Sequence, residues 1–222
     1  MKKALGKECK ERKRKTLRAA VCLLAAFLLW TAAVCTVDVR AIGPMGSSVG
    51  LAAVNGFVHR MTGGHMALYT LTDWLSVVPA GFAAGFAALG LAQWGRRKSI
   101  LRVDRSILAL GGFYLAVLAA YLFFEVFIVN YRPVLIEDVL EASYPSSTTV
   151  LVLCVMTTAA MQLSGRMKHG AGRRAALAGM AAFAALMVLL RFLSGVHWLT
   201  DIVGGVLLSG GLVCLYAWAA EQ

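Results

Sequence analysis

The sequence is poor in proline, in acidic residues and in charged residues of any kind. Only four of its 222 residues are proline, 11 are acidic, and charged residues make up 15% of the chain. Hydrophobic residues make up 59%, and the mean hydropathy is +0.73. This composition excludes an ordinary soluble domain and predicts an all-α, polytopic membrane protein.

The cysteines form no pattern typical of a metal site. The sequence has no CxxC pair, and no histidine lies next to a cysteine. One cysteine lies in the basic N-terminal segment and the other four lie in apolar runs. We therefore interpret all five as small packing residues and predict no metal site. They are Cys9, Cys22, Cys35, Cys154 and Cys214.

Lysine and arginine outnumber acidic residues by 22 to 11, which gives a net charge of +11. Such an excess is also found in nucleic-acid-binding proteins, but here it is concentrated between apolar runs. Residues 1–18 hold nine basic residues, residues 95–105 hold five and residues 166–174 hold four, which is 18 of the 22. The positive-inside rule places these three segments in the cytoplasm. Membrane orientation thus explains the charge, and we predict no nucleic-acid partner.

Six apolar runs approach the ~20 residues that a helix needs to cross a bilayer. They predict a six-transmembrane-helix bundle, with a basic cytoplasmic tail (1–18) before a single membrane domain (19–222) and with both termini in the cytoplasm. The tail is expected to be solvated and to contact anionic lipid headgroups. We interpret the first run as a retained anchor because it is long for a signal peptide. The runs are residues 19–37, 74–94, 107–129, 145–163, 175–190 and 198–219.

Residues 38–72 are mixed in character and are predicted to form an outer segment. A weakly amphipathic stretch, 49–61, is expected to be an interfacial helix lying over the site described next. The segment also contains His59 and His65, which we interpret as ordinary loop residues.

The stretch from Arg191 to Asp201 places three ionisable side chains between two apolar runs, where charge is expensive. On a helix, His197 and Asp201 would share one face. The aspartate could then accept a hydrogen bond from one ring nitrogen and leave the other as a nucleophile or base. Ser194 and Gly195 predict a break, with one helix ending at Arg191 and the next starting near His197, that lets Arg191 converge on the same small anion. The alternative is a structural pair that locks the last two spans together.

Two further segments are predicted to reach the same outer side. Arg132 precedes Pro133, which disfavours a continued helix and places the guanidinium near a helix end. Pro145, Ser146 and Ser147 predict a helix start, whose hydroxyls and unpaired N–H groups suit a phosphate. Serines at helix starts often only cap, and arginines near span ends often extend to headgroups. The convergence of three segments nevertheless predicts a site for a membrane-delivered phosphate.

These residues resemble the integral-membrane branch of the type 2 phosphatidic acid phosphatase superfamily. Its three motifs are Lys-x6-Arg-Pro, Pro-Ser-Gly-His and Ser-Arg-x5-His-x3-Asp, and the resemblance covers roughly residues 70–220. The matching residues are Arg132-Pro133 for the first motif, Pro145-Ser146 for the second, and Arg191, His197 and Asp201 for the third.

The resemblance implies a role for each matching residue. His197 would attack phosphorus and form a phosphohistidine, and Asp201 would orient it. No metal or other cofactor is implied. The residues that would bind the phosphoryl oxygens are Arg132, Arg191, Ser146, Ser147 and Thr148.

Leu190 replaces the family's serine before Arg191, and two further departures from the family pattern bear on the chemistry. Glu125 replaces the lysine and, seven residues before Arg132, is predicted to lie on the same helix face about 10 Å deeper. We expect it to modulate the site through a salt bridge or hydrogen bond that positions an arginine. Thr148 replaces the histidine that protonates the leaving group. A hydroxyl cannot act as a general acid near neutral pH, which costs ~10²–10⁴ in rate for an alkoxide leaving group.

We therefore predict a lipid phosphatase or diphosphatase of the cell membrane, with its site facing outside and its substrate entering laterally. An isoprenoid diphosphate is favoured, because its leaving phosphate needs little protonation. The alternative is a catalytically inactive relative that binds lipid phosphates or has a structural role, which Thr148 and Glu125 support. Phosphoryl transfer to another acceptor would use the same phosphohistidine. A transporter is disfavoured because the charged residues cluster at one surface.

Overall fold

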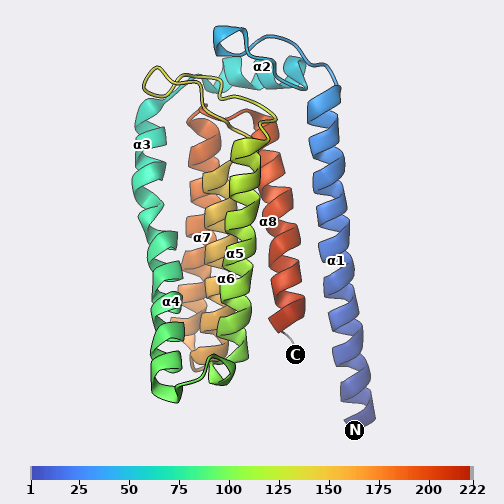
Figure 1. Cartoon of the computed structure of the whole chain (residues 1–222), viewed down its shortest axis with the longest axis vertical. Coiled ribbons are helices and arrows are strands. Elements are labelled where there is room, and N and C mark those ends of the chain that lie inside the picture. Colours follow the sequence, from blue (N-terminus) through green and yellow to red (C-terminus); the bar gives the residue numbers. More distant parts are fainter. Residues whose placement is uncertain (1, 221–222) are drawn as a thin grey trace.

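The protein is a bundle of long helices, described here by a computed structural model of residues 2–220 that includes the side chains of residues 7, 8 and 10–220. Within the described chain, six helices are long and apolar enough to span a bilayer and no β-strand forms, which confirms the predicted fold class (Figure 1). Met1, Glu221, Gln222 and the side chain of Cys9 lie outside the described residues.

The first helix, α1 (Lys2–Thr36), is continuous from the basic segment into the first span. No proline interrupts it, so the basic tail is helical and continuous with the first span, and most of its described side chains are exposed. Near its N-terminal end the Lys13 ammonium lies 5.6 Å from the centre of the Trp218 ring on the last helix, α8 (Leu199–Ala220).

The outer segment contains the interfacial helix, α2 (Ala52–Thr62), close to the predicted bounds. It lies across one end of the bundle and follows a short 3₁₀ turn at Pro44–Gly46 (Figure 1). The Asp38 carboxylate accepts a 2.7 Å hydrogen bond from the Ala53 N–H, which stabilises the start of this helix.

The second span is longer than predicted and consists of two helices, α3 (Met66–Leu75) and α4 (Val77–Arg97). Hydropathy alone missed α3 because threonine and aspartate interrupt its apolar pattern. The break between the two lies at Ser76, where Pro79 has no N–H to donate to the carbonyl of Leu75. A 3₁₀ turn, Ile100–Arg102, then leads to α5 (Arg105–Val126).

The remaining spans are α6 (Ser147–Arg166), α7 (Ala171–Leu193) and α8. Helix α6 is the most buried of the six spans and packs against α4, α5, α7 and α8. Helix α1 packs along α8, where Gly211 leaves room for Leu24; a Cβ at Gly211 would lie only 2.6 Å from a Leu24 methyl carbon.

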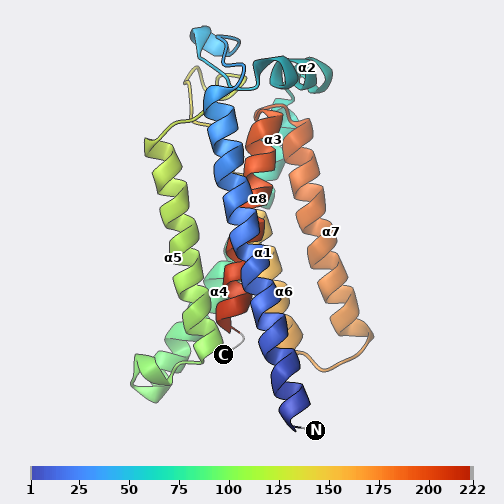
Figure 2. The ribbon, with the colours of Figure 1, turned by 90° about the vertical axis from the view of Figure 1, so that its right-hand side faces the viewer.

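The two ends of the bundle differ in character. The beginning and end of the described chain and the connections 98–104 and 167–170 lie at one end (Figures 1 and 2). Helix α2, the loop 127–146 and the turn 194–198 lie at the other (Figure 2). The three basic segments therefore gather at one end of the bundle, and the candidate site lies at the opposite end.

Candidate active site

The turn between α7 and α8 places the histidine. Helix α7 ends at Leu193, two residues beyond the predicted end, and the break follows at Ser194-Gly195, where Gly195 has a φ of +64°. A Cβ at this glycine would overlap the carbonyl oxygen of Gly63, so the approach of the α2–α3 connection excludes any side chain there. The N–H of His65 donates to the Ser194 carbonyl at 2.7 Å and ties that connection to the turn.

The prediction that His197 and Asp201 share one helical face is wrong, because α8 begins only at Leu199. The two side chains nevertheless meet. The turn directs His197 Nδ1 to within 3.8 Å of Asp201 Oδ2 and 3.1 Å of the Ser143 carbonyl oxygen. Since both neighbours of Nδ1 are acceptors, the proton belongs on Nδ1.

The other ring nitrogen of His197 is the chemically available one. The residue is only 4% exposed, and Nε2 has no hydrogen-bond partner among the described residues. Burial lowers the pKa of His197 to about 4; Arg132 and Arg191 also lower it, and Asp201 opposes the shift. The imidazole is thus neutral at neutral pH and presents an unshared electron pair on Nε2.

Asp201 is completely buried and forms the first turn of α8. One carboxylate oxygen accepts the Trp198 N–H at 2.9 Å, and the other accepts the Asn130 side-chain amide at 3.2 Å. These bonds fix the carboxylate beside His197 and satisfy a buried charge.

Arg191 is 2% exposed and lies against α3. It donates to the Thr72 hydroxyl at 3.0 Å, lies 3.6 Å from the Asp73 carboxylate, and stacks 4.7 Å from the centre of the Tyr69 ring. Its Nε has no hydrogen-bond partner in the described part of the chain. A buried guanidinium with an unused donor suits an anion.

Arg132 does not lie on the helix that carries Glu125, and this prediction is wrong. Helix α5 ends at Val126, because the following chain is held by other partners: the Asn130 side chain bonds Asp201, and its carbonyl accepts the Ser143 N–H at 2.9 Å. Arg132 therefore belongs to the loop 127–146.

The guanidinium of Arg132 still reaches the site. It lies 5.7 Å from the centre of the Tyr69 ring, which Arg191 also approaches, and its Nε lies 3.0 Å from the Glu141 carboxylate without hydrogen-bond alignment. Its Nη1 is buried and has no hydrogen-bond partner among residues 2–220. Two buried cations thus lie near Tyr69, and both lower the pKa of His197.

The start of α6 differs in detail from the predicted cap. Ser146 precedes the helix but makes no side-chain capping bond; its hydroxyl accepts the Thr149 hydroxyl at 3.0 Å, and its N–H donates to the Asp201 carbonyl. The first N–H groups of any α-helix have no partner within it. Those of α6 lie beside Ser147 and Thr148, where they can serve an anion.

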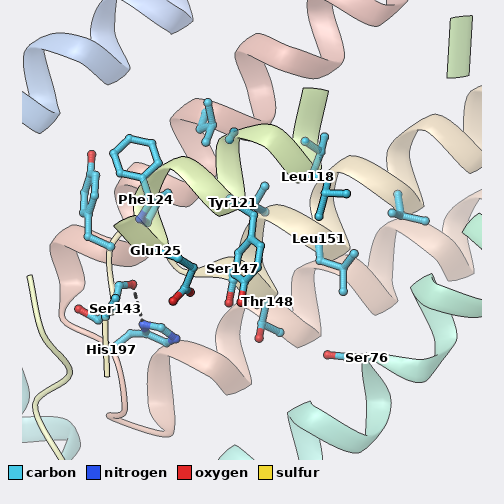
Figure 3. A pocket seen from close by; sticks show the side chains of 18 of the residues that line it. Ser76, Leu118, Tyr121, Phe124, Glu125, Ser143, Ser147, Thr148, Leu151 and His197 are labelled. Carbon is cyan, nitrogen blue, oxygen red and sulfur yellow. Dashed lines mark hydrogen bonds between the residues drawn. The ribbon is translucent and has the colours of Figure 1, made fainter. Parts of the chain in front are cut away.

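A cavity of about 460 Å³ opens beside this site. Figure 3 shows His197, Ser143 and Glu125 near one end, and Leu118 and Leu151 farther along. The predicted site residues that line it are Glu125, Ser147, Thr148 and His197. Those that lie outside its lining are Arg132, Arg191, Ser146 and Asp201.

The salt bridge expected for Glu125 is not formed with either arginine. Arg132 is paired with Glu141 and Arg191 with Asp73, and within the described chain Glu125 has no ion pair. Its side chain instead extends into the cavity toward His197 (Figure 3).

Several residues of the site were not predicted. The sequence could not show that the backbone carbonyl of Ser143 accepts from His197, because every residue has a backbone carbonyl. Asn130 was detectable as an amide at the end of an apolar run. The acidic, aromatic and hydroxyl partners of the two arginines lie on a helix that hydropathy missed or in an irregular loop; they are Tyr69, Thr72, Asp73 and Glu141. His59 and His65 do not line the cavity.

The second half of the chain is similar to a known protein family. Residues 126–222 match the PAP2 superfamily. The predicted resemblance is therefore confirmed, and the matched segment contains the loop with Arg132, the start of α6 and the His197–Asp201 turn. No curated protein matches the sequence.

The PAP2 fold extends over most of the chain. The crystal structure of a transmembrane PAP2-type phosphatidylglycerolphosphate phosphatase from Bacillus subtilis aligns with a TM-score of 0.58 and 19% identity. The alignment covers 90% of this chain and 94% of that one. The protein is therefore a multi-pass membrane protein with a PAP2 fold.

Proposed function

We propose that the protein is a lipid phosphatase or diphosphatase that works through a phosphohistidine on His197. The observation that carries this proposal is the buried Nε2 of His197, which has no partner among residues 2–220 and belongs to a residue that lines the cavity. A merely structural histidine at this depth would be expected to use both ring nitrogens.

The reaction follows from the proton position. Nε2 attacks phosphorus while the Nδ1 proton stays between Asp201 and the Ser143 carbonyl, which stabilise the positive imidazolium that forms. Arg132 and Arg191 neutralise the phosphoryl oxygens, and water then cleaves the phosphorus–nitrogen bond. A phosphate entering the site would compete with Glu141 and Asp73 for these guanidinium groups.

The phosphate is proposed to be that of a lipid. Beyond His197 the cavity is lined by apolar side chains from α5 and α6, among them Leu118, Leu151 and Val155. These helices are membrane spans, so a lipid would bring its chain to the cavity from the bilayer. The six apolar helices support a cell-membrane location, and the charge distribution favours a site on the outer side with both termini in the cytoplasm.

Within the described residues, no group of three or more His, Cys, Asp or Glu side chains is placed to hold a metal. The proposed mechanism assigns each step to side chains of this chain. The assay therefore omits added metal and includes a chelator.

The alternative is an inactive relative that binds lipid phosphates, and Thr148 is the observation that favours it. Its hydroxyl lines the cavity where the family has an acid. Without another proton donor, a diphosphate would be hydrolysed faster than a monoester. Transfer of the phosphoryl group to an acceptor other than water would use the same first step.

The test is phosphate release by purified protein in detergent, from phosphatidic acid and from an isoprenoid diphosphate. We expect wild-type protein to release phosphate and H197A to release none, because the nucleophile is removed. H59A is the matched control: it removes a histidine that packs 5.3 Å from Trp198 but does not line the cavity. Equal inactivity of the wild type and H197A on both lipids would reject the enzyme in favour of the binding protein.

A further inference from the structure

The carboxyl group of Glu125 lines the cavity where the leaving group of a lipid phosphate would lie. Helices α5 and α6 run in opposite directions, with Glu125 in the last turn of α5 and Thr148 in the first turn of α6. Both line the cavity at the end that contains His197 (Figure 3).

The apolar part of the cavity begins just below these two residues. Leu118 is seven residues before Glu125 on α5, and Val155 is seven residues after Thr148 on α6, so each lies roughly 10 Å deeper at 1.5 Å per residue. In the proposed reaction, a lipid chain would occupy the apolar part and its phosphate would occupy the end beside His197. The oxygen that joins them must therefore lie between, at the level of Glu125 and Thr148.

Glu125 has a side chain available for proton transfer. It is exposed to the cavity, and it is not engaged by either arginine, since each has another acidic partner. Its neighbour one turn below, Tyr121, contacts it and lines the same cavity. In its acid form the carboxyl group would carry the proton that the leaving oxygen needs, and it would not repel a bound phosphate dianion.

We propose that Glu125 is the general acid and base of the reaction, in place of the histidine that Thr148 has lost. This inference rests on the proposed phosphatase function. The residue that looked unfavourable for a phosphate site thus becomes a catalytic residue.

The proton balance closes over the two half-reactions. As Nε2 of His197 bonds to phosphorus, the bond from phosphorus to the lipid oxygen breaks, and the carboxyl proton of Glu125 passes to that oxygen. The neutral alcohol departs. Water then attacks the phosphohistidine and gives its proton to the Glu125 carboxylate, while the electrons of the nitrogen–phosphorus bond return to Nε2. Phosphate leaves, and both side chains are restored.

The test compares two monoesters that share a phosphate group and differ in the leaving group. The leaving group of phosphatidic acid is an alkoxide that needs a proton, whereas the leaving group of p-nitrophenyl phosphate is a stable phenolate. E125Q is expected to lower kcat for phosphatidic acid by ~10²-fold or more, which is the usual contribution of a general acid. Its kcat for p-nitrophenyl phosphate should change by less than about fivefold, because that leaving group needs no acid.

Two further variants separate chemistry from structure. E137Q makes the same substitution at an exposed residue of the loop 127–146 that does not line the cavity, and it should behave as wild type with both substrates. Adding T148H to E125Q returns an acid from the opposite helix and should restore turnover of phosphatidic acid. Rescue of this kind is not expected if E125Q has only disturbed packing.

The outcomes are distinct. Equal loss of both activities in E125Q would assign Glu125 a structural role and overturn the inference, as would unchanged activity with both substrates. Wild-type turnover of diphosphates but not of phosphatidic acid would also overturn it while leaving the phosphatase intact. If wild type and H197A are equally inert with every substrate, the proposed function itself fails.

Discussion

The substitution D201N separates the two groups that orient His197. It keeps the size of the side chain and removes its charge, while the Ser143 carbonyl, 3.1 Å from Nδ1, remains in place. When the imidazolium forms, it lies 3.8 Å from the aspartate. With an effective dielectric constant of about 20, a charge pair at that distance is worth ~4 kcal/mol.

A loss of ~4 kcal/mol in transition-state stabilisation lowers kcat by ~10³-fold. D201N should also lower stability, because Trp198 and Asn130 direct donors at the two oxygens and an asparagine offers only one acceptor. We expect that mismatch to cost ~1–3 kcal/mol of unfolding free energy. The assay is therefore steady-state phosphate release together with thermal unfolding in the same detergent.

D38N is the matched control for the structural part. Asp38 also accepts a backbone N–H at the start of a helix, at 2.7 Å, but it does not line the cavity. It should lose stability without the large loss of kcat. If stably folded D201N keeps kcat within about threefold of wild type, the charge argument is wrong, and the Ser143 carbonyl alone is sufficient.

Three further predictions concern the same site. R191K keeps the charge but loses the forked donors and the 3.0 Å bond to Thr72, so kcat/KM should fall ~10–100-fold in the phosphate-release assay. G195A places a side chain on a residue with a φ of +64° and against Gly63. Calorimetry should therefore show that the free energy of unfolding falls by about 1–3 kcal/mol or more. The proposed mechanism uses the neutral form of His197 as nucleophile, and burial lowers the pKa of this residue to about 4, so kcat/KM should be retained at pH 5 and fall only as the pH drops through 4. A fall centred near 6.5, the ordinary value for histidine, would contradict this burial argument.

The bundle could be predicted because the bilayer imposes a strong constraint on the sequence. Uninterrupted apolar length revealed each span, and the placement of Lys and Arg predicted which connections share an end. The break at Gly195 was also predictable, since a Ser-Gly pair between two ionisable residues is unfavourable for a continuous buried helix. Helix α3 was missed because it contains polar residues that face Arg191. These residues lower its hydropathy below that of the other spans.

The structure brings several residues of the candidate site together, but not through the helical scaffold that the sequence predicted. His197 and Asp201 meet through a turn and a capping bond to Trp198, whereas helical spacing suggested a shared face. Arg132 reaches the site from a loop, which depends on the long-range bond between Asn130 and Asp201. Interactions between residues 71 positions apart leave no periodic signal in the sequence.

The acidic partners of the two arginines follow from the same limitation. Asp73 is far from its partner Arg191 in sequence, whereas Glu141 is close to its partner Arg132. Neither pairing follows a helical repeat. Their effect is to hold buried guanidinium groups in place when no phosphate is bound. Glu125, whose spacing of seven residues from Arg132 suggested a pairing on one helical face, is instead directed into the cavity.

The most direct test of the central claim is detection of the phosphorylated histidine itself. Wild-type protein would be mixed with lipid substrate labelled in the phosphoryl group, quenched in alkali within milliseconds, and digested for mass spectrometry. Phosphate on His197, absent from H197A and formed in stoichiometric yield before steady-state release, is the predicted result. Turnover of the lipid by wild-type protein with no phosphate on His197, or with the phosphate on another residue, would contradict the account.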